Sequence, residues 1–399
     1  MNKSIKLLDC TLRDGGYVNN WKFGHDTARF IFEQLCSADI DIVEIGFLND
    51  KYSNCVENTI QNNTLGFDTM FKNCDKKDTL VFAMIDYGTC SIDNIAPKSE
   101  SIIDGIRLIF KKPNMFKAIE FGKILAEKGY LVSYQLVSIT DYFDRDILDF
   151  CDEINKINPF CVSIVDTYGL MHKEKMLSYY YLLDHNLNKD ITIGYHSHNN
   201  FQLGYANSLE FLNRNTTRNL LVDGTVYGMG KGAGNAPLEL ITMYLNENYD
   251  KRYNINNILE IIDVCLVNIY NRTPWGYNYL YYLNASNACH PKYVNYLTNK
   301  KTLSIKSINI ILQQIPFQDK LLYKENIIEK LYLDYQKSQS KDYARNKDHN
   351  ILDNTTDVLL LGPGKNLMKQ SNNINEYIKI NNPYVISLNC IPTDRKSVV

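Results

Sequence analysis

The sequence predicts an α/β fold: a closed barrel of eight parallel strands, a helical extension after it, and a short β-α-β segment at the C-terminus. Two observations carry the barrel. Short runs rich in β-branched and aromatic residues occur eight times between residues 5 and 230, and amphipathic stretches lie between them. Alternating strands and helices form parallel sheets, and eight such units favour a closed TIM barrel over an open sheet. We expect this barrel to occupy residues 1–250.

The predicted strands share an apolar centre and are bounded by turn residues. They are 5–12 (IKLLDCTL), 40–47 (IDIVEIGF), 79–86 (TLVFAMID), 105–110 (GIRLIF), 130–139 (YLVSYQLVSI), 161–169 (CVSIVDTYG), 191–198 (ITIGYHSH) and 220–230 (LLVDGTVYGMG). The helices expected between them share apolar residues that return every three or four positions. The clearest are 25–38, 114–129, 144–157, 176–187 and 203–214.

Beyond the barrel the pattern changes. Residues 251–350 are expected to form a helical extension and a linker, because 255–272 has a helical pattern and 335–357 is polar and charged. In 351–399 a strand, a glycine turn, a helix and a strand indicate a short Rossmann-like segment, too short to complete a nucleotide-binding domain. Its GPGK turn lacks the spacing of the known phosphate loops, which favours a packing appendage or part of a longer domain over a nucleotide site.

The composition narrows the class of protein. The 399 residues carry a net charge of −2, with 45% hydrophobic and 22% charged residues, which is typical of a soluble globular protein. We therefore expect no nucleic acid and no membrane as a partner. The sequence shows no signal-peptide core and no apolar run near the roughly 18 residues of a membrane span, and its ten scattered cysteines contain no C-x-x-C pair. A cytoplasmic protein with reduced thiols is expected.

The strongest chemical signal is the pair of histidines in GYHSHN. His196 and His198 are two residues apart on a predicted strand, so both rings point to one face. They come late in that strand, and the carboxyl ends of the strands form the mouth where barrel active sites lie. A lone histidine is more often structural, but two at this spacing favour a metal site, because neutral imidazole binds divalent first-row metals.

A third ligand is expected on a neighbouring strand. Closure of the barrel makes the first, second, seventh and eighth strands consecutive, and the first strand ends in Arg13 and Asp14. Asp14 by itself could be a helix cap or a turn residue. Together with the two histidines it would form a site with open positions for substrate and water.

Two further groups complete the predicted site. Glu44 is an acid inside the apolar strand 40–47, and a buried acid needs a partner, for which Arg13 is the nearest candidate. A rim residue that faces water is the alternative. The glycine-rich run GTVYGMGKGAGNAPLE allows the backbone to approach a ligand and presents the amide of Asn235, whereas a phosphate cradle would need a different spacing.

These motifs, LLDCTLRDGG, IVEIGF, VDTYG, HSHNN and GMGKGAGNAPLE, together resemble the DRE-TIM metallolyases, a family with hydroxymethylglutaryl-CoA lyase and 4-hydroxy-2-oxovalerate aldolase among its members. The resemblance implies that Asp14, His196 and His198 bind a divalent metal, with Asn235 as a fourth ligand. It also implies that the arginine of the motif steadies an enolate oxygen and that the glutamate of the second strand pairs with it. GAGNAPLE is most similar to the 4-hydroxy-2-oxovalerate aldolases, since the Claisen-type enzymes have R-D-G-E-Q where this chain has RDGGY.

One position departs from these aldolases. They carry a histidine three residues after the metal aspartate, as acid or base, and this chain has Tyr17 there. The candidates for proton carrier are Tyr17, a metal-bound water, and His290 in ASNACHPKY, if the helical extension folds back over the mouth. The pKa of an unperturbed tyrosine, near 10, makes Tyr17 a poor base at neutral pH unless the metal or Arg13 lowers it.

The expected activity is that of an aldolase that uses Mg²⁺ or Mn²⁺ to cleave or form a carbon–carbon bond of a 4-hydroxy-2-oxo acid, with pyruvate enolate and an aldehyde as partners. The alternatives are Claisen chemistry on an acyl-CoA, a non-heme iron oxygenase, and a non-catalytic binding or assembly module. A homodimer is expected by analogy with other barrels. The opening DCTLRDGGYVNNW and the tail VLLLGPGKNL also resemble aldolase-type proteins of bacterial surface-polysaccharide gene clusters.

Overall fold

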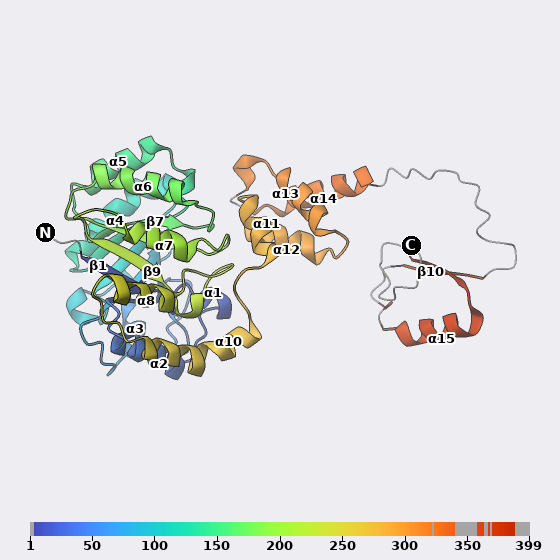
Figure 1. Ribbon diagram of the computed structural model, residues 1–399, viewed down its shortest axis with the longest axis horizontal. Helices are drawn as coiled ribbons and strands as arrows, with labels where there is room; N and C mark the ends of the chain where they lie inside the picture. Colours follow the sequence, from blue (N-terminus) through green and yellow to red (C-terminus); the bar gives the residue numbers. More distant parts are fainter. Residues whose placement is uncertain (1–3, 321–322, 340–356, 363–365, 368, 388–399) are drawn as a thin grey trace. The chain divides into compact units, whose positions relative to one another are not determined.

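The computed structural model describes residues 4–320, 323–339, 357–362, 366–367 and 369–387. The chain divides into two compact units, Met1–Ser286 and Asn287–Val399. The first unit holds the barrel, and the second holds helices and a two-stranded sheet (Figure 1). Within the described residues, no helix is long and apolar enough to cross a membrane.

All eight predicted strands are confirmed, and they close into a barrel of parallel strands. Around the barrel they are β1 (Ile5–Asp9), β2 (Ile42–Leu48), β4 (Leu80–Asp86), β5 (Gly105–Ile109), β6 (Leu131–Leu136), β7 (Cys161–Asp166), β8 (Thr192–Ser197) and β9 (Leu220–Gly224). Pairing of β1 with both β9 and β2 closes the ring. The additional strand β3 (Ile60–Gln61) pairs with the end of β2; it is too short to leave a periodic signal in the sequence.

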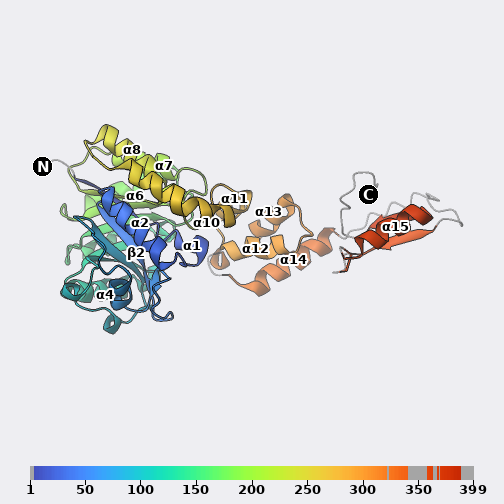
Figure 2. The same cartoon turned by 90° about the horizontal axis from the view of Figure 1, so that it is seen from below.

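Helices surround the strands on the outside (Figures 1 and 2). They are α1 (Gly16–Asn19), α2 (His25–Ser37), α3 (Thr64–Met70), α4 (Met115–Glu127), α5 (Asp144–Ile154), α6 (Lys173–Asn186), α7 (Gly204–Leu212) and α8 (Leu238–Asn248). In α5 the spacing that predicted the helix also explains its packing, because Ile147, Phe150, Cys151 and Ile154 form one buried face. The five helices expected between the strands are present.

The inside of the barrel has an apolar floor and a charged layer beyond it. The floor is formed by Leu8, Cys10, Ile42, Phe82, Cys161 and Leu221. Side chains two positions further along a strand point to the same face, so Glu44 follows Ile42 and Asp223 follows Leu221 toward the carboxyl ends. The strand period thus explains why charged groups gather at the active end of the barrel.

After α8 the first unit continues with α9 (Ile255–Ile261), a π-helical turn (Ile262–Leu266), α10 (Val267–Arg272) and α11 (Tyr279–Ser286). The second unit contains α12 (Pro291–Asn299), α13 (Ile305–Gln313) and α14 (Glu325–Gln339). It also contains β10 (Val358–Leu361) and β11 (Tyr384–Ser387), a parallel pair connected through α15 (Ser371–Asn381).

The linker predicted for 335–357 is wrong at its beginning. Residues 335–339 are the last part of α14, and the hydroxyls of Tyr335 and Ser307 hydrogen-bond at 2.8 Å, so this polar stretch packs on α13. The rest of that linker, residues 340–356, and the PGK of the GPGK turn lie outside the described residues. The predicted division of the chain into a barrel domain (1–250), a helical extension with a linker (251–350) and a C-terminal segment (351–399) stays a prediction.

Candidate active site

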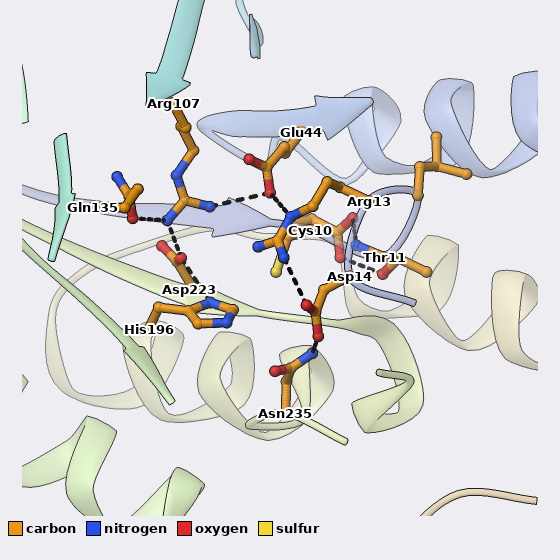
Figure 3. Close-up of polar contacts among 12 residues, drawn as sticks. Cys10, Thr11, Arg13, Asp14, Glu44, Arg107, Gln135, His196, Asp223 and Asn235 are labelled. Carbon is orange, nitrogen blue, oxygen red and sulfur yellow. Dashed lines mark hydrogen bonds and ion pairs between the residues drawn. The ribbon is translucent and has the colours of Figure 1, made fainter. Parts of the chain in front are cut away.

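The metal-binding residues predicted from the sequence lie together where the strands end. Asp14 follows β1, His196 is in β8 and His198 follows it, and one ligand atom of each lies within 4.8 Å of the others. All three residues are buried. Asn235, in the loop after β9, donates from Nδ2 to Asp14 Oδ2 at 2.5 Å (Figure 3). The structure therefore gathers the four predicted ligands from three neighbouring strands.

A tight turn after β1 aims Asp14 into this cluster. The backbone N–H of Asp14 donates to the Cys10 carbonyl at 2.7 Å. A Cβ atom on Gly15 would lie 2.2 Å from the carbonyl oxygen of Thr11, so only glycine allows the turn to close on itself. The glycines of RDGG thus serve close packing of the turn that carries the arginine and the aspartate.

The orientation of His196 is set by a buried carboxylate. Its Nδ1 lies 3.0 Å from Asp223 Oδ2 on β9. A histidine that donates from one ring nitrogen to a carboxylate presents the other nitrogen as a metal ligand, which is the usual arrangement around bound metals. His196 can therefore offer Nε2 to a cation in the cluster.

Unpartnered buried atoms show that the cluster fits a cation. Nδ1 of His198 and Oδ1 of Asn235 are buried, and neither has a hydrogen-bond partner in the described structure. Burial lowers the pKa of His198 to about 3 in spite of nearby Asp14, so the ring is neutral at physiological pH. Burial alone would raise the pKa of Asp14, but Arg13, the two histidines and the hydrogen bond from Asn235 together outweigh it and hold the pKa below its usual value. Neutral imidazole, carboxylate and amide oxygen are suitable donors for a divalent metal.

Arg13 is held by two carboxylates. Its Nε lies 2.7 Å from Glu44 Oε2, and its Nη1 lies 2.6 Å from Asp14 Oδ1. Arg13 and Glu44 are both buried, so the glutamate lies against the guanidinium and does not face water. Among the described residues, no group accepts a hydrogen bond from Nη2 of Arg13, which leaves that nitrogen for a ligand.

Sequence reasoning missed the residue that connects the two halves of the site. Arg107 on β5 is fully buried, lies 3.1 Å from Glu44 Oε2, and forms a short ion pair with Asp223 (Figure 3). Its Nη2 also donates to Gln135 Oε1 at 2.8 Å. A continuous chain of ion pairs and hydrogen bonds thus runs from His196 through Asp223, Arg107 and Glu44 to Arg13.

Of the three predicted proton carriers, Tyr17 and His290 are side chains, and they belong to different units. Tyr17 lines the same cavity as Arg13 and the metal cluster, with its ring 4.7 Å from that of Trp21. The surrounding protein desolvates its hydroxyl and, with Asp14, raises its pKa to about 12. His290 belongs to the second unit, where its Nδ1 accepts from the Lys292 backbone N–H at 3.2 Å and caps α12. A catalytic role for His290 stays a prediction.

Fold and site together define the class: a TIM barrel with a group of residues that could hold a divalent metal and an arginine beside it. The comparison with known families agrees, because the HMGL-like family matches residues 4–265. The chain belongs to this family, and the resemblance to the DRE-TIM metallolyases is confirmed. The protein is therefore an enzyme of the metal-dependent carbon–carbon lyase class.

Similar proteins carry related names. A 4-hydroxy-2-oxovalerate aldolase of Pseudoalteromonas translucida (strain TAC 125) is 36% identical over 259 residues, which cover 61% of this chain and 70% of that protein. An oxaloacetate decarboxylase of Mycobacterium tuberculosis (strain ATCC 25618 / H37Rv) is 26% identical over 255 residues, covering 60% and 69%. The N-terminal domain of an assigned aldolase from Bacteroides vulgatus superposes with a TM-score of 0.62 at 24% identity, covering 76% of this chain and 98% of that one, which supports the fold.

Proposed function

We propose that this protein is an aldolase that cleaves or forms the carbon–carbon bond of a 4-hydroxy-2-oxo acid through a pyruvate enolate. One observation carries the proposal: the Asp14, His196 and His198 cluster and the guanidinium of Arg13 line the same cavity. Reactions next to a 2-oxo acid develop negative charge on an enolate oxygen, and fixed positive groups at that position accelerate them.

The residues divide this task among them. Asp14, His196, His198 and Asn235 would hold Mg²⁺ or Mn²⁺, which when bound acts as a Lewis acid toward the 2-oxo group. Glu44 fixes the Arg13 guanidinium so that its free Nη2 donates to the enolate oxygen. Pre-organised donors of this kind cost no reorganisation when the charge develops.

A proton must leave the 4-hydroxyl when an aldol bond breaks. We assign this step to the Tyr17 hydroxyl, because it lines the cavity beside Arg13 and occupies the position where the resembling aldolases carry a histidine. The raised pKa of Tyr17 keeps its hydroxyl protonated at neutral pH, so in bond formation it donates its proton to the aldehyde oxygen, and in cleavage the tyrosinate formed by that step takes the proton of the 4-hydroxyl.

A second candidate is decarboxylation of a 2-oxo diacid. The loss of CO₂ also leaves a pyruvate enolate, but it requires no base for a hydroxyl proton, so replacement of the histidine by Tyr17 would matter less. The similar oxaloacetate decarboxylase points in the same direction.

The test is a comparison of substrates with one purified, Mn²⁺-loaded protein. We expect pyruvate release from 4-hydroxy-2-oxo acids, such as 4-hydroxy-2-oxopentanoate, measured with a coupled pyruvate assay. Pyruvate release from oxaloacetate alone would favour the second candidate. CoA release from acetyl-CoA and a 2-oxo acid without aldol activity would contradict both and favour Claisen chemistry. If the Asp14→Asn and His196→Ala variants retained the protein's cellular role, that role would not depend on catalysis, and a function as a binding module would be favoured.

A further inference from the structure

Lys231 brings a positive charge to the mouth that the metal site does not need. It follows Gly230 in the loop after β9, its residue is exposed, and it lines the same cavity as Arg13 and the metal cluster. A Cβ atom on Gly230 would lie 2.2 Å from Asn235 Nδ2 and 2.7 Å from Asp14 Oδ2. The glycine therefore lets the loop descend onto the metal ligands, which places the next residue at the rim of the cavity.

The backbone and the side chain of Lys231 both contact residues of the site. Its N–H lies 3.4 Å from Asp14 Oδ2, and its Nζ lies 5.5 Å from the centre of the Tyr17 ring. The contact with the ring holds the ammonium weakly, since such contacts at exposed sites stabilise by roughly 0.5–1 kcal/mol. The ammonium thus lies beside Tyr17, to which we assign the proton transfer at the 4-hydroxyl, the oxygen that becomes that of the aldehyde.

Lys231 differs from Arg13 in having no counter-charge. Arg13 is paired with Glu44 and Asp14, whereas in the part of the chain that the structure describes no carboxylate forms an ion pair with the Lys231 ammonium. Apart from the histidines, the charged side chains that line the cavity are Arg13, Asp14 and Lys231.

When the charges of the site with metal and substrate bound are added, the positive charge of Lys231 has no negative counterpart. A divalent cation is neutralised by Asp14 and by the 2-oxo carboxylate of the substrate, and Arg13 is neutralised by Glu44. One positive charge then remains at the rim. Charge complementarity between a site and its ligand chiefly determines specificity, and like or missing charges are penalised.

We propose that Lys231 binds a second anionic group, a carboxylate or a phosphate, on the part of the substrate that becomes the aldehyde. The inference rests on the proposed aldolase function and narrows its substrate class to 4-hydroxy-2-oxo acids with a charged far end. An uncharged aldehyde would instead contact the apolar side of the cavity, formed by Phe47, Met84 and Ile109.

A binding experiment tests this inference without turnover. Mn²⁺-loaded protein is titrated by calorimetry with 2-oxoglutarate and with 2-oxopentanoate, which have the same chain length but differ in the terminal charge. We expect the wild type to bind the diacid about 10-fold more tightly or better, since hydrogen bonds to charged groups are among the stronger ones. The Lys231→Met variant loses this preference and Lys231→Arg keeps most of it. Lys117→Met, a change of an exposed lysine on α4, serves as the control. Equal affinities in the wild type, or a preference retained by Lys231→Met, would overturn the inference.

Condensation of pyruvate with matched aldehydes distinguishes whether the second anionic group is a carboxylate or a phosphate. Glyceraldehyde is compared with glyceraldehyde 3-phosphate, and butanal with succinic semialdehyde. We expect Lys231→Met to lower kcat/KM for the charged aldehydes at least about 10-fold more than for the neutral ones. An equal loss with charged and neutral aldehydes would overturn the specificity role in favour of proton transfer by Lys231. If the wild type turned over no aldehyde, the aldolase proposal would fail, and the titration would still decide whether Lys231 binds a distal anion.

Discussion

The carboxyl end of the barrel contains two groups of polar side chains that can be compared directly. The inner layer consists of Glu44, Arg107, Gln135 and Asp223, which lie on strands inside the barrel. The mouth consists of Asp14, Tyr17, His196, His198, Lys231 and Asn235. In the inner layer the positive group, Arg107, forms ion pairs with both carboxylates. Buried atoms without a described hydrogen-bond partner occur in both groups: Glu44 Oε1, Arg107 Nε and Asp223 Oδ1 in the inner layer, and His198 Nδ1 and Asn235 Oδ1 in the mouth. Among the described residues of the two groups, the charged side chain without an ion pair is Lys231 in the mouth.

The difference separates positioning from binding. Charges buried inside a protein are costly unless they are paired, so a closed set of ion pairs holds its members in one geometry. His198 in the mouth belongs to a group with metal-ligand geometry and lines the cavity, so an ion or a substrate can reach its unpartnered nitrogen. The inner layer therefore orients Arg13 and His196, and the mouth supplies the groups that bind metal and substrate.

The largest effect is expected from Asp14→Asn, which breaks the mouth. Loss of the carboxylate removes the only negative ligand of the described cluster, so we expect loss of bound Mn²⁺ and a fall in kcat of about 10³-fold or more. Metal content by atomic emission and steady-state rates would measure both. Asp152→Asn, on the exposed face of α5, is the control. A variant with full metal content would contradict the assigned ligand set.

Next in size is Arg107→Met, which breaks the inner layer. The change removes the ion pairs of Arg107 with the buried carboxylates of Glu44 and Asp223. Because a buried charge without a partner is costly, we expect the free energy of unfolding to fall by about 3–5 kcal/mol. Urea unfolding followed by circular dichroism would measure it. Arg145→Met removes an arginine that is paired with Asp149 on the exposed face of α5, and should cost no more than about 1 kcal/mol. Similar losses in the two variants would show that the inner layer is not a distinct structural unit.

A smaller effect is expected at the junction of the two groups, in Asp223→Asn. This change weakens the hydrogen bond that orients His196, and we expect the affinity for Mn²⁺ to fall about 10- to 100-fold. Competition with a fluorescent chelator would give the affinity of folded protein. Unchanged metal affinity would mean that Asp223 serves stability alone.

The last prediction concerns Asp9, a buried carboxyl for which the described residues provide no ion-pair partner. Its carboxylate oxygens accept hydrogen bonds from the backbone N–H and hydroxyl of Thr11, but burial outweighs them and raises its pKa to about 7. A carboxyl whose pKa is higher in the folded than in the unfolded protein stabilises the fold at a pH below its unfolded pKa, which is near 4. This contribution to the free energy of unfolding is lost as the pH rises through the folded pKa of about 7. Stability measured between pH 4 and 7 should therefore fall more steeply in the wild type than in Asp9→Asn. Parallel curves would contradict this assignment.

Much of the fold was predictable, since the strands of this barrel carry their pattern locally. Glu44 was found because it is an acid inside an apolar strand. The same signal was present in GIRLIF and in LLVDG, and it would have identified Arg107 and Asp223. What the sequence does not contain is the pairing: Arg107 contacts residues 63 and 116 positions away, and only closure of the barrel brings them together.

The most direct test of the central claim is hydrogen exchange at the methyl group of pyruvate. The claim is that the mouth and Arg13 together stabilise a pyruvate enolate, and this step needs no aldehyde. In D₂O with Mg²⁺, the wild type should replace the methyl protons with deuterium, followed as loss of the ¹H NMR signal of pyruvate. Chelator treatment, Asp14→Asn and Arg13→Met should each stop the exchange. Metal-loaded wild type that exchanges no faster than chelator-treated protein would contradict the claim.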